Sequence, residues 1–356
     1  MKGEKLLTLL IIIFITLSLL DSSFLFRSVS YINFEAISLI VSFMMVSKLL
    51  DVSGAFSRLS IWIISKEDEW KILTLLLLIS ELSAALLMND TALFFMVPLV
   101  ITLSRISGRR LQDLAILVTI AVNVGSALTP FGNPQNIIIW SHYHVMIAEF
   151  VIEMTPFFLL STGLLLLFAT FTTPMNLRKV KIPMIKLNLR LTILALILLF
   201  LNVVSAQVGL YWIGLAITVV ASAVLKKELL FKIDIPLLAI FCFLFMDFGQ
   251  ISHLMEIWRV IPSLTGFNAL IVSALLSQLI SNVPATITLL NHIPDWRALA
   301  IGVNLGGTGL ITGSMANVIT LRLAGIDLKK FHEISIPYFI GSLACFLSLS
   351  YLLIYP

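Results

Sequence analysis

Charged residues are scarce in this chain, and no polar stretch is long enough to form a soluble domain. Only 12% of its 356 residues are charged and 59% are hydrophobic, whereas soluble domains carry about 25% charge. Long apolar runs, such as 6–20 and 191–201, recur from end to end. A helix that spans a bilayer needs about 20 mostly apolar residues. The sequence therefore predicts an all-α, polytopic membrane protein.

Cysteine and the familiar enzyme motifs are also scarce or missing. The two cysteines, Cys242 and Cys345, lie in apolar segments without metal-site spacing, and we expect neither a disulfide nor a metal centre. No Walker A pattern, nucleophile elbow or HExxH motif is present, so ATP-driven transport and the common hydrolases lack support. We expect a protein that is not an enzyme and has no cofactor. The net charge of +4 reflects loop residues that orient the chain in a membrane, so no nucleic-acid partner is expected.

Simple membrane spans account for just over a third of the chain. We expect them at 5–20, 32–50, 147–172, 190–205, 209–225, 234–248 and 334–354. The apolar segment 72–103 is too long for one span, and Asn89-Asp90-Thr91 interrupts its middle. Segment 266–290 contains Ser281-Asn282-Val283-Pro284. We interpret both as re-entrant hairpins, which enter and leave on the same side of the membrane.

Two further apolar segments predict broken helices. Segment 112–140 contains two prolines and a glycine within five residues, at 130–134, and prolines break helices. Segment 297–321 carries glycines at 302, 306, 307, 309 and 313. With a cytoplasmic N-terminus, this arrangement puts all but three of the 23 basic residues on the cytoplasmic side, and only Arg27, Arg259 and Arg297 outside. The positive-inside rule supports that orientation.

An internal repeat links the broken helices. Residues 122–136 align without gaps with 303–317, an offset of 181, and five of the 15 positions are identical. The repeat reads span, span, hairpin, broken helix, span. We expect a first copy at 1–172, a linker with one linking helix at 173–208, and an inverted second copy at 209–356. Inverted-topology repeats are typical of secondary transporters. Close helix packing explains some of the glycines, but it does not explain the prolines.

The breaks predict an ion site near the middle of the membrane. Helix N-termini attract anions, and carbonyl and amide oxygens suit Na⁺. Asp90 is the sharpest candidate, because an ionisable group at that depth is costly and usually functional. The alternative is an acid that only caps the hairpin tip. Glu81 is a weaker candidate. Asp247, Glu149 and Glu153 are expected near the outer boundary, in contact with solvent.

At these residues the chain resembles the ion transporter superfamily, which includes arsenite permeases, divalent anion:sodium symporters, citrate transporters and sodium/proton antiporters of the NhaD type. The resemblance is carried by the tips 89–92 and 281–284 and the loops 129–136 and 306–317, and it is greatest to small arsenite-permease-like anion permeases. It implies a scaffold domain, a mobile transport domain that moves like an elevator, and a homodimer. In the dicarboxylate branch each tip reads Ser-Asn-Thr. Here Val283 replaces the threonine of the second tip and Asp90 enters the first.

Residue by residue, the motifs give two candidate sets. Expected substrate ligands are Asn89, Thr91, Thr129, Pro130, Asn133, Ser281, Asn282, Thr308, Thr312 and Ser314. Expected ion-coupling positions are Asp90, Asn123, Gly125, Gly132, Asn136, Asn304, Gly306, Gly313 and Asn317, with Na⁺ at Asn89 and Asn282.

The leading hypothesis is a plasma-membrane secondary transporter of a small anion, arsenite-like, inorganic or carboxylate, coupled to H⁺ or Na⁺. The alternative is a sodium/proton antiporter that uses Asp90. A membrane-embedded enzyme or receptor is disfavoured, because the spans hold no paired catalytic groups.

Overall fold

The computed structural model describes residues 2–55, 58, 69–107, 112–172, 186–226, 228, 235–257 and 263–354. Within these ranges every regular element is a helix. The elements are α1 (Lys2–Leu20), α2 (Phe24–Arg27), η1 (Ser28–Tyr31), α3 (Phe34–Val52), α5 (Glu69–Leu86), α6 (Asn89–Ser107), α7 (Gln112–Ser126), α8 (Pro134–Tyr143), α9 (Ile147–Thr172), α10 (Leu189–Gln207), α11 (Tyr211–Lys226), α12 (Ile235–Ile257), α13 (Gly266–Ile280), α14 (Asn282–Leu289), α15 (Trp296–Gly306), η3 (Ile311–Gly313), α16 (Met315–Ala324) and α17 (Leu328–Ile354).

Several of these helices have the length and composition of membrane spans. Among the described residues, four qualify: Ile147–Thr172, Leu189–Gln207, Ile235–Met255 and Leu328–Leu349. A fifth span results if Phe24–Tyr31 and Phe34–Leu50, which meet at 51°, count as one. Helices α10 and α11 expose large apolar side chains such as Phe200 and Val224, as a lipid-facing surface requires. The prediction of an all-α, multi-pass membrane protein is confirmed.

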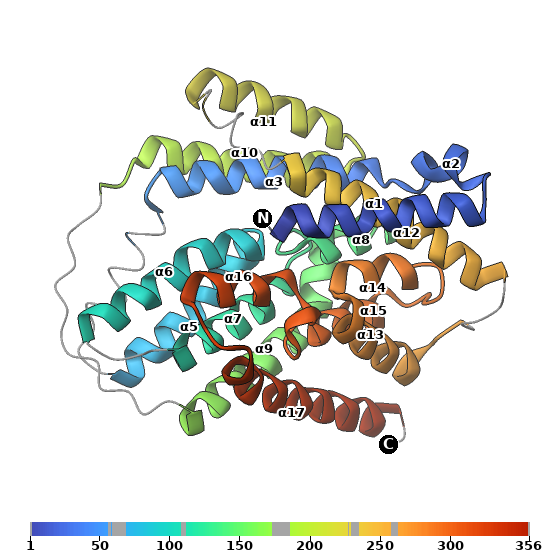
Figure 1. Ribbon diagram of the computed structural model, residues 1–356. Helices are drawn as coiled ribbons and strands as arrows, with labels where there is room; N and C mark the ends of the chain where they lie inside the picture. Colours follow the sequence, from blue (N-terminus) through green and yellow to red (C-terminus); the bar gives the residue numbers. More distant parts are fainter. Residues whose placement is uncertain are drawn as a thin grey trace.

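The helices form two groups that meet along α12 (Figure 1). Helices α3, α10 and α11 pack on one another, and α1 packs on α12. The second group contains the interrupted helices, with α5 against α7 and α13 against α15. Helix α12 joins the groups, because it contacts α1 and α3 on one side and α14 on the other.

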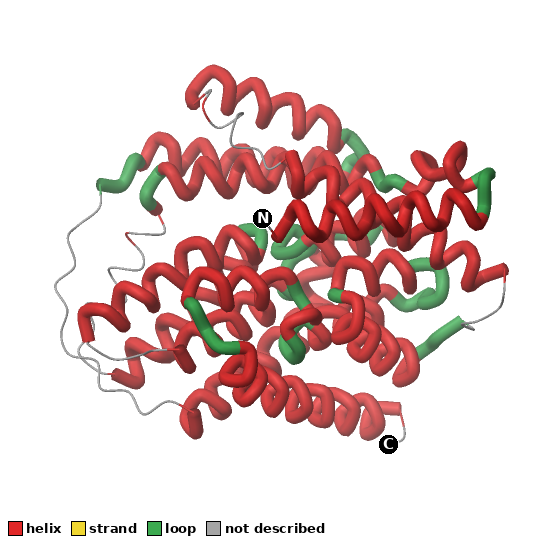
Figure 2. The backbone as a smooth tube through the Cα atoms, viewed as in Figure 1, coloured by secondary structure: helices red, strands yellow, loops and turns green. Residues whose placement is uncertain are grey.

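The four interruptions expected from the sequence are present (Figure 2). Segment 72–103 divides into α5 and α6 at residues 87–88, and segment 266–290 divides into α13 and α14 at Ser281. Segment 112–140 divides into α7 and α8 across the loop 127–133, and segment 297–321 into α15 and α16 around the short turn η3. The span expected at 147–172 is confirmed residue for residue by α9.

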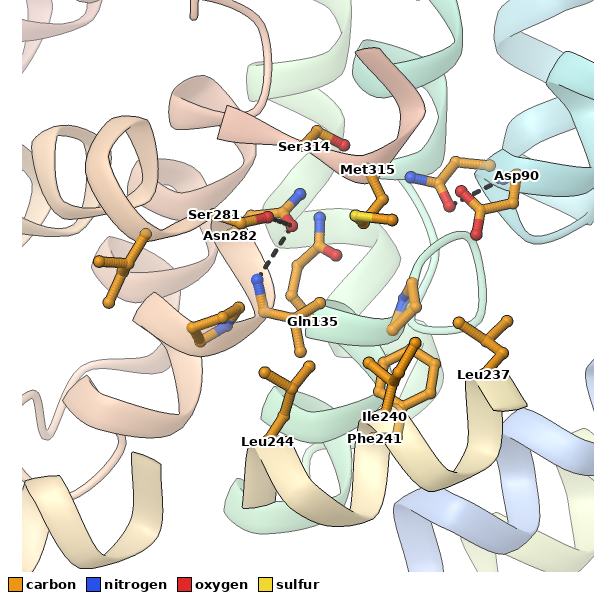
Figure 3. A pocket seen from close by; sticks show the side chains of 15 residues that line it. Asp90, Gln135, Leu237, Ile240, Phe241, Leu244, Ser281, Asn282, Ser314 and Met315 are labelled. Carbon is orange, nitrogen blue, oxygen red and sulfur yellow. Dashed lines mark hydrogen bonds between the residues drawn. The ribbon is translucent and has the colours of Figure 1, made fainter. Parts of the chain in front are cut away.

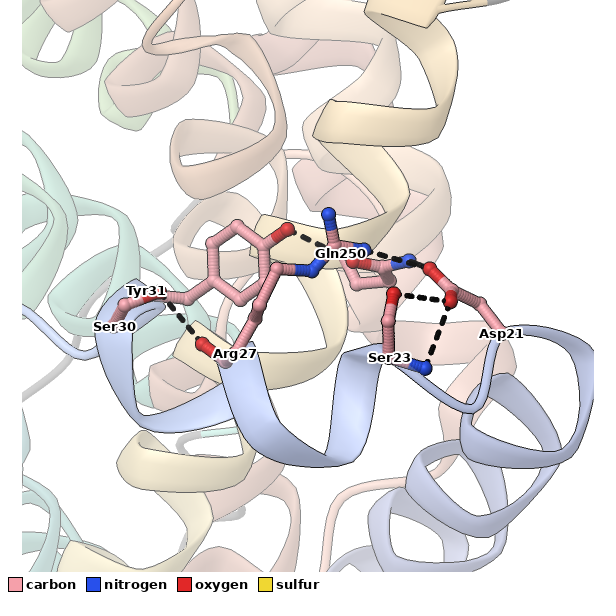
Figure 4. Close-up of polar contacts among 6 residues, drawn as sticks. All are labelled: Asp21, Ser23, Arg27, Ser30, Tyr31 and Gln250. Atoms are coloured by element: carbon pink, nitrogen blue, oxygen red, sulfur yellow. Dashed lines mark hydrogen bonds and ion pairs between the residues drawn. The ribbon is translucent and has the colours of Figure 1, made fainter.

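Polar contacts fasten the loop after α1 to α12 (Figure 4). Asp21 accepts hydrogen bonds from the Ser23 hydroxyl at 2.6 Å, from Arg27 at 2.7 Å and from Gln250 Nε2 at 3.0 Å. The Tyr31 hydroxyl donates to Gln250 Oε1 at 2.8 Å. Helix α12 is thereby tied to both ends of the turn between α1 and α3.

One expected position is wrong. Asp247 was placed near the outer boundary in contact with solvent, but its side chain is 0% exposed. The cause is the length of α12, which continues to Ile257 rather than ending at 248, so Asp247 lies in the middle of the helix. Glu149 and Glu153 are solvent-accessible as expected. Residues 59–68 and the start of the linker at 173–185 lie outside the described residues.

Candidate functional site

A cavity of about 130 Å³ lies where four helices begin. Asn89 and Asp90 start α6, and Pro134 and Gln135 start α8. Asn282 starts α14 and Met315 starts α16, and both also line the cavity. The first N–H groups of a helix lack partners within the helix, and the aligned peptide dipoles place partial positive charge there. Four helix N-termini around one cavity give it a positive potential, which favours the binding of an anion.

The opposite wall of the cavity is apolar. Leu237, Ile240, Phe241 and Leu244 of α12 form it, and Figure 3 shows them below the polar groups. Gln135 lies between the two hairpin tips, with Asp90 on one side and Asn282 on the other (Figure 3). The cavity thus has a polar side built by interrupted helices and an apolar side built by a continuous one.

Capping side chains explain why the helices begin at these positions. Asn133 precedes Pro134 and accepts from the Asn136 N–H at 2.9 Å, and Ser314 accepts from the Ala316 N–H at 3.3 Å. At the hairpin tips, Asn89 and Asn282 each accept from the next backbone N–H at 2.9 Å. Asparagine and serine are preferred N-cap residues because their oxygens pair with otherwise unpartnered N–H groups.

Ser281, at the second tip, has a strained backbone. Its φ is +77° and its ψ is 154°, a region that residues with a Cβ rarely adopt. Such conformations cost about 1–3 kcal/mol and persist where the surrounding structure enforces them. The strain falls on a cavity-lining residue, between the last turn of α13 and the first turn of α14.

Four asparagines connect the two broken helices in a reciprocal way. Asn123 of α7 donates to Asn317 Oδ1 at 3.0 Å, and Asn304 of α15 donates to Asn136 Oδ1 at 2.8 Å. The aligned positions are 123 with 304 and 136 with 317, so each bond is the counterpart of the other. All four side chains are buried. A buried polar network with its partners in place fixes one arrangement of the surrounding backbone.

The same asparagines close both loops. Asn136 Nδ2 donates to the carbonyls of Ser126, at 3.3 Å, and Thr129, at 3.0 Å. Asn317 Nδ2 donates to the carbonyls of Gly307 and Leu310, both at 3.0 Å. Positions 307 and 310 follow 126 and 129 by the same 181 residues. Each loop is therefore held by equivalent contacts.

Glycines let the hairpins approach the broken helices. A Cβ on Gly125 would collide with the Glu81 backbone of α5, and one on Gly306 would collide with Ser277 and the Ala274 carbonyl of α13. Close approach of two backbones requires glycine at these two positions. The hairpins consequently pack directly on the helices that carry the asparagine network.

The expected site residues divide into two sets. Asn89, Asp90, Ser281, Asn282 and Ser314 line the cavity. The remaining described residues build the network and loops around it: Asn123, Gly125, Thr129, Pro130, Gly132, Asn133, Asn136, Asn304, Gly306, Thr308, Thr312, Gly313 and Asn317.

Among this second set, the threonines tie the loops to neighbouring helices. Thr129 donates to the Ala85 carbonyl of α5 and Thr312 to the Gln278 carbonyl of α13, both at 2.6 Å. Thr308 donates to the Leu305 carbonyl at 2.7 Å. The Thr91 side chain lies outside the described part of the structure.

Sequence reasoning missed Gln135, Met315, the α12 wall and Gln278. Buried Gln278 donates to the Gly306 carbonyl and accepts from the Leu310 N–H, so it joins α13 to the second broken helix. An amide in the apolar run of α13 was the available signal for Gln278. Nothing in the sequence marked the α12 residues as cavity-lining, because apolar residues that face a cavity and apolar residues that face lipid have the same composition.

The described residues contain no group of three or more histidine, cysteine or acidic side chains that could hold a metal ion. Cys242 and Cys345 are both free thiols.

An all-helical membrane fold whose interrupted helices meet at one cavity is the architecture of a membrane transporter. Comparison with known proteins agrees. The chain belongs to the CitMHS family, described as citrate transporter, whose profile matches residues 4–295.

Its relatives are membrane proteins and transporters. The inner membrane protein YbiR of Escherichia coli is 34% identical over 95% of this chain and 93% of its own length. A protein named as a transporter in Methanocaldococcus jannaschii is 30% identical over 82% of this chain and 79% of its own. A 46 kDa membrane protein of Mycobacterium leprae is 28% identical over 88% of this chain and 83% of its own. The resemblance to the ion transporter superfamily is thereby confirmed.

Proposed function

We propose that the chain is a secondary active transporter of a small anion, coupled to H⁺ or Na⁺. One observation carries this proposal: four helix N-termini line a single cavity that contains neither lysine nor arginine. Backbone N–H groups and helix dipoles therefore supply the positive potential, each helix contributing about half an elementary charge at its start.

The size of the cavity favours a compact substrate. Its volume of about 130 Å³ is comparable to the roughly 150 Å³ cavity that accommodates benzene in another protein. The family description, citrate transporter, makes carboxylates the first class to test, followed by inorganic and arsenite-like species. The apolar α12 wall suits the carbon skeleton of a carboxylate.

Asp90 is the basis for coupling and for the alternative function. Its carboxyl lines the same cavity from the first turn of α6, and a carboxylate beside a bound anion is repulsive unless a proton or Na⁺ compensates it. Coupling to one of these cations follows, with Na⁺ held at the tips by Asn89 and Asn282. The alternative is a sodium/proton antiporter in which Asp90 binds the cation and no anion is carried.

We further propose two inverted repeats, 1–172 and 209–356, separated by the linker 173–208, with re-entrant hairpins α5–α6 and α13–α14. The hydrogen bonds repeated at an offset of 181 support this assignment. Long-range contacts support the grouping of the loops by side, because they join loops expected on the same side: the Tyr143 hydroxyl donates to the Ile293 carbonyl, and Lys330 pairs with Asp113 at 3.1 Å.

In the proposed arrangement the protein lies in the plasma membrane, and its N-terminus lies in the cytoplasm. Two chains associate through the group that contains α3, α10 and α11, because its exposed apolar side chains form a surface on which a second copy can pack. The group with the interrupted helices then moves against it like an elevator.

Thermal unfolding of the purified protein with a panel of anions, each with and without Na⁺ and at two pH values, tests the function. A ligand at about 100 times its dissociation constant adds about 2.7 kcal/mol to the stability of the folded protein. We expect stabilisation by one anion class, dependent on Na⁺ or on pH. Asn282→Ala should lose that stabilisation, whereas Asn291→Ala, in an exposed loop, should keep it.

Each outcome identifies one function. Stabilisation by a carboxylate or inorganic anion supports the transporter of anions. Stabilisation by Na⁺ or Li⁺ alone, without an anion effect, supports the antiporter. No response to any ion contradicts both.

A further inference from the structure

A second buried carboxyl lies away from the cavity, on α5. The Glu81 side chain is 0% exposed and does not line the cavity. Its backbone faces Gly125, where α5 and α7 approach most closely. Gly125 lies between Asn123, of the asparagine network, and Ser126, the last residue of α7.

Only one of the two Glu81 carboxyl oxygens has a hydrogen-bond partner among the described residues. Thr162 of α9 donates to Glu81 Oε2 at 3.0 Å, while Oε1 has no partner among the described residues. Tyr338 of α17 lies within electrostatic reach, and its hydroxyl donates to the Ser161 carbonyl at 2.9 Å. The Ser161 hydroxyl is also buried without a partner. Other residues of α5, such as Leu77 and Ile79, belong to an apolar cluster with residues of α7, α9 and α17.

Charges that could neutralise Glu81 lie elsewhere on the packed elements. The described ionisable groups of α6, α7, α9 and α17 are Asp90 at the cavity, Asp113 and Glu333 beside Lys330, Glu149 and Glu153 paired with Arg297, Lys329, His332, which accepts from the Ile311 N–H, Cys345 and Tyr338. Tyr338 interacts electrostatically with Glu81, and it brings no positive charge. A carboxylate buried at this depth without a cation is costly, whereas the carboxylic acid is tolerated.

We propose that Glu81 is a proton-binding site separate from the cavity and that it supplies a coupling proton, in addition to the proton or Na⁺ that compensates Asp90 in the cavity. The step is the reversible addition of one proton to the Glu81 carboxylate to give the neutral acid, with no other bond made or broken. Thr162 holds Oε2 while Oε1 takes the proton. This inference rests on the proposed function, because a coupling proton requires a secondary transporter.

The packing connects Glu81 to the loops at the cavity. The α5 backbone at Glu81 touches α7 at Gly125, and two residues earlier Asn123 bonds Asn317, beyond the second break. Moving the charged carboxylate out of its apolar surroundings shifts α5 against α7 and so disturbs the loops that position the α8 and α16 N-termini. Proton release and opening of the cavity are then linked.

The test uses the full-length protein in vesicles and two assays. Exchange of labelled for unlabelled anion at equal pH reports substrate binding and movement, and accumulation driven by a pH gradient reports coupling. Glu81→Gln, a neutral side chain of the same shape, should retain exchange but lose accumulation by about tenfold or more, within the 5–150-fold range typical of coupling between sites. Asp247→Asn, the matched buried carboxyl on α12, should retain both.

Other variants keep the inference testable if Glu81→Gln does not fold. Glu81→Asp retains a carboxyl and should retain accumulation, and Thr162→Val should move the pH midpoint of accumulation because Oε2 loses its donor. Accumulation by Glu81→Gln at the wild-type level, or its loss in Asp247→Asn instead, overturns the assignment but leaves the proposed function standing. A wild-type protein that exchanges no anion overturns the proposed function and this inference together.

Discussion

Removal of the Asn304 side chain gives a direct test of the reciprocal asparagine network. Asn304 donates to Asn136 Oδ1 and to the Ala300 carbonyl, both at 2.8 Å. It accepts from Asn133 at 2.9 Å and from Gln135 at 3.3 Å. Asn304→Ala therefore removes four contacts from a buried site at the cavity.

The loss in the free energy of unfolding depends on the polar groups that Asn304→Ala leaves without a hydrogen-bond partner. Asn133 Nδ2 keeps a second partner, the Ser126 hydroxyl at 2.9 Å. Asn136 Oδ1 and Gln135 Nε2 lose the contact with Asn304 and remain buried. A buried polar group without a partner costs about 1–3 kcal/mol, so two of them lower the free energy of unfolding by about 2–6 kcal/mol. Transport should fall too, because Gln135 lines the cavity.

Thermal unfolding and anion exchange of the same preparation measure both effects. The matched control is Asn291→Ala, which removes the same side chain from an exposed loop and should change stability by less than about 0.5 kcal/mol. Asn123→Ala should resemble Asn304→Ala, since the two occupy aligned positions and make reciprocal bonds. If Asn304→Ala is as stable and as active as the control, the network does not support the site.

Three further variants test separate features. Gly306→Ala should destabilise the protein by about 1–3 kcal/mol, because its Cβ meets α13. Gly341→Ala, inside α17, meets nothing within 4 Å and should stabilise by up to about 1 kcal/mol; equal stabilities of the two variants would contradict the close approach. Ser281→Gly should be more stable than Ser281→Ala by about 1 kcal/mol, because only glycine tolerates this φ; the reverse order in thermal unfolding would show that the strain is absent. The hydrogen bond from Ser23 lowers the pKa of Asp21 from its usual 3.8, so the ionised form stabilises the fold above that value. Asp21→Asn should therefore be less stable than wild type near neutral pH, and the difference should fade as the pH falls below 3.8; a difference independent of pH would refute the assignment.

Much of the fold followed from local sequence signals. The span 147–172 and all four interruptions were predictable, because a run of apolar residues fixes a span, and Asn, Gly and Pro interrupt it in recognisable combinations. The end of α12 was not predictable, since polar residues such as Asp247 and Gln250 near the end of an apolar run ordinarily mark a boundary. Their burial depends on α1, α3 and α14, which pack around them from distant parts of the chain.

The site was predictable in outline but not in detail. The tips and breaks contributed Asn89, Asp90, Asn282 and Ser314 to one cavity, because an interruption exposes backbone groups that need a polar environment. Which residues line the cavity and which stand behind it depends on the direction of each side chain after assembly. Gln135 lies two residues from Asn133, yet the first lines the cavity and the second caps α8.

The reciprocal bonds between aligned asparagines also bear on how the chain is made. During synthesis the first half enters the membrane with Asn123 and Asn136 in place, but Asn317 and Asn304, to which they bond, lie near the other end of the sequence. The asparagines of the first broken helix therefore lack these hydrogen-bond partners until the second broken helix has been synthesised. In a symmetric dimer, each contact between two positions recurs with the partners exchanged. This single chain reproduces that arrangement within itself, because Asn123 bonds Asn317 and Asn304 bonds Asn136.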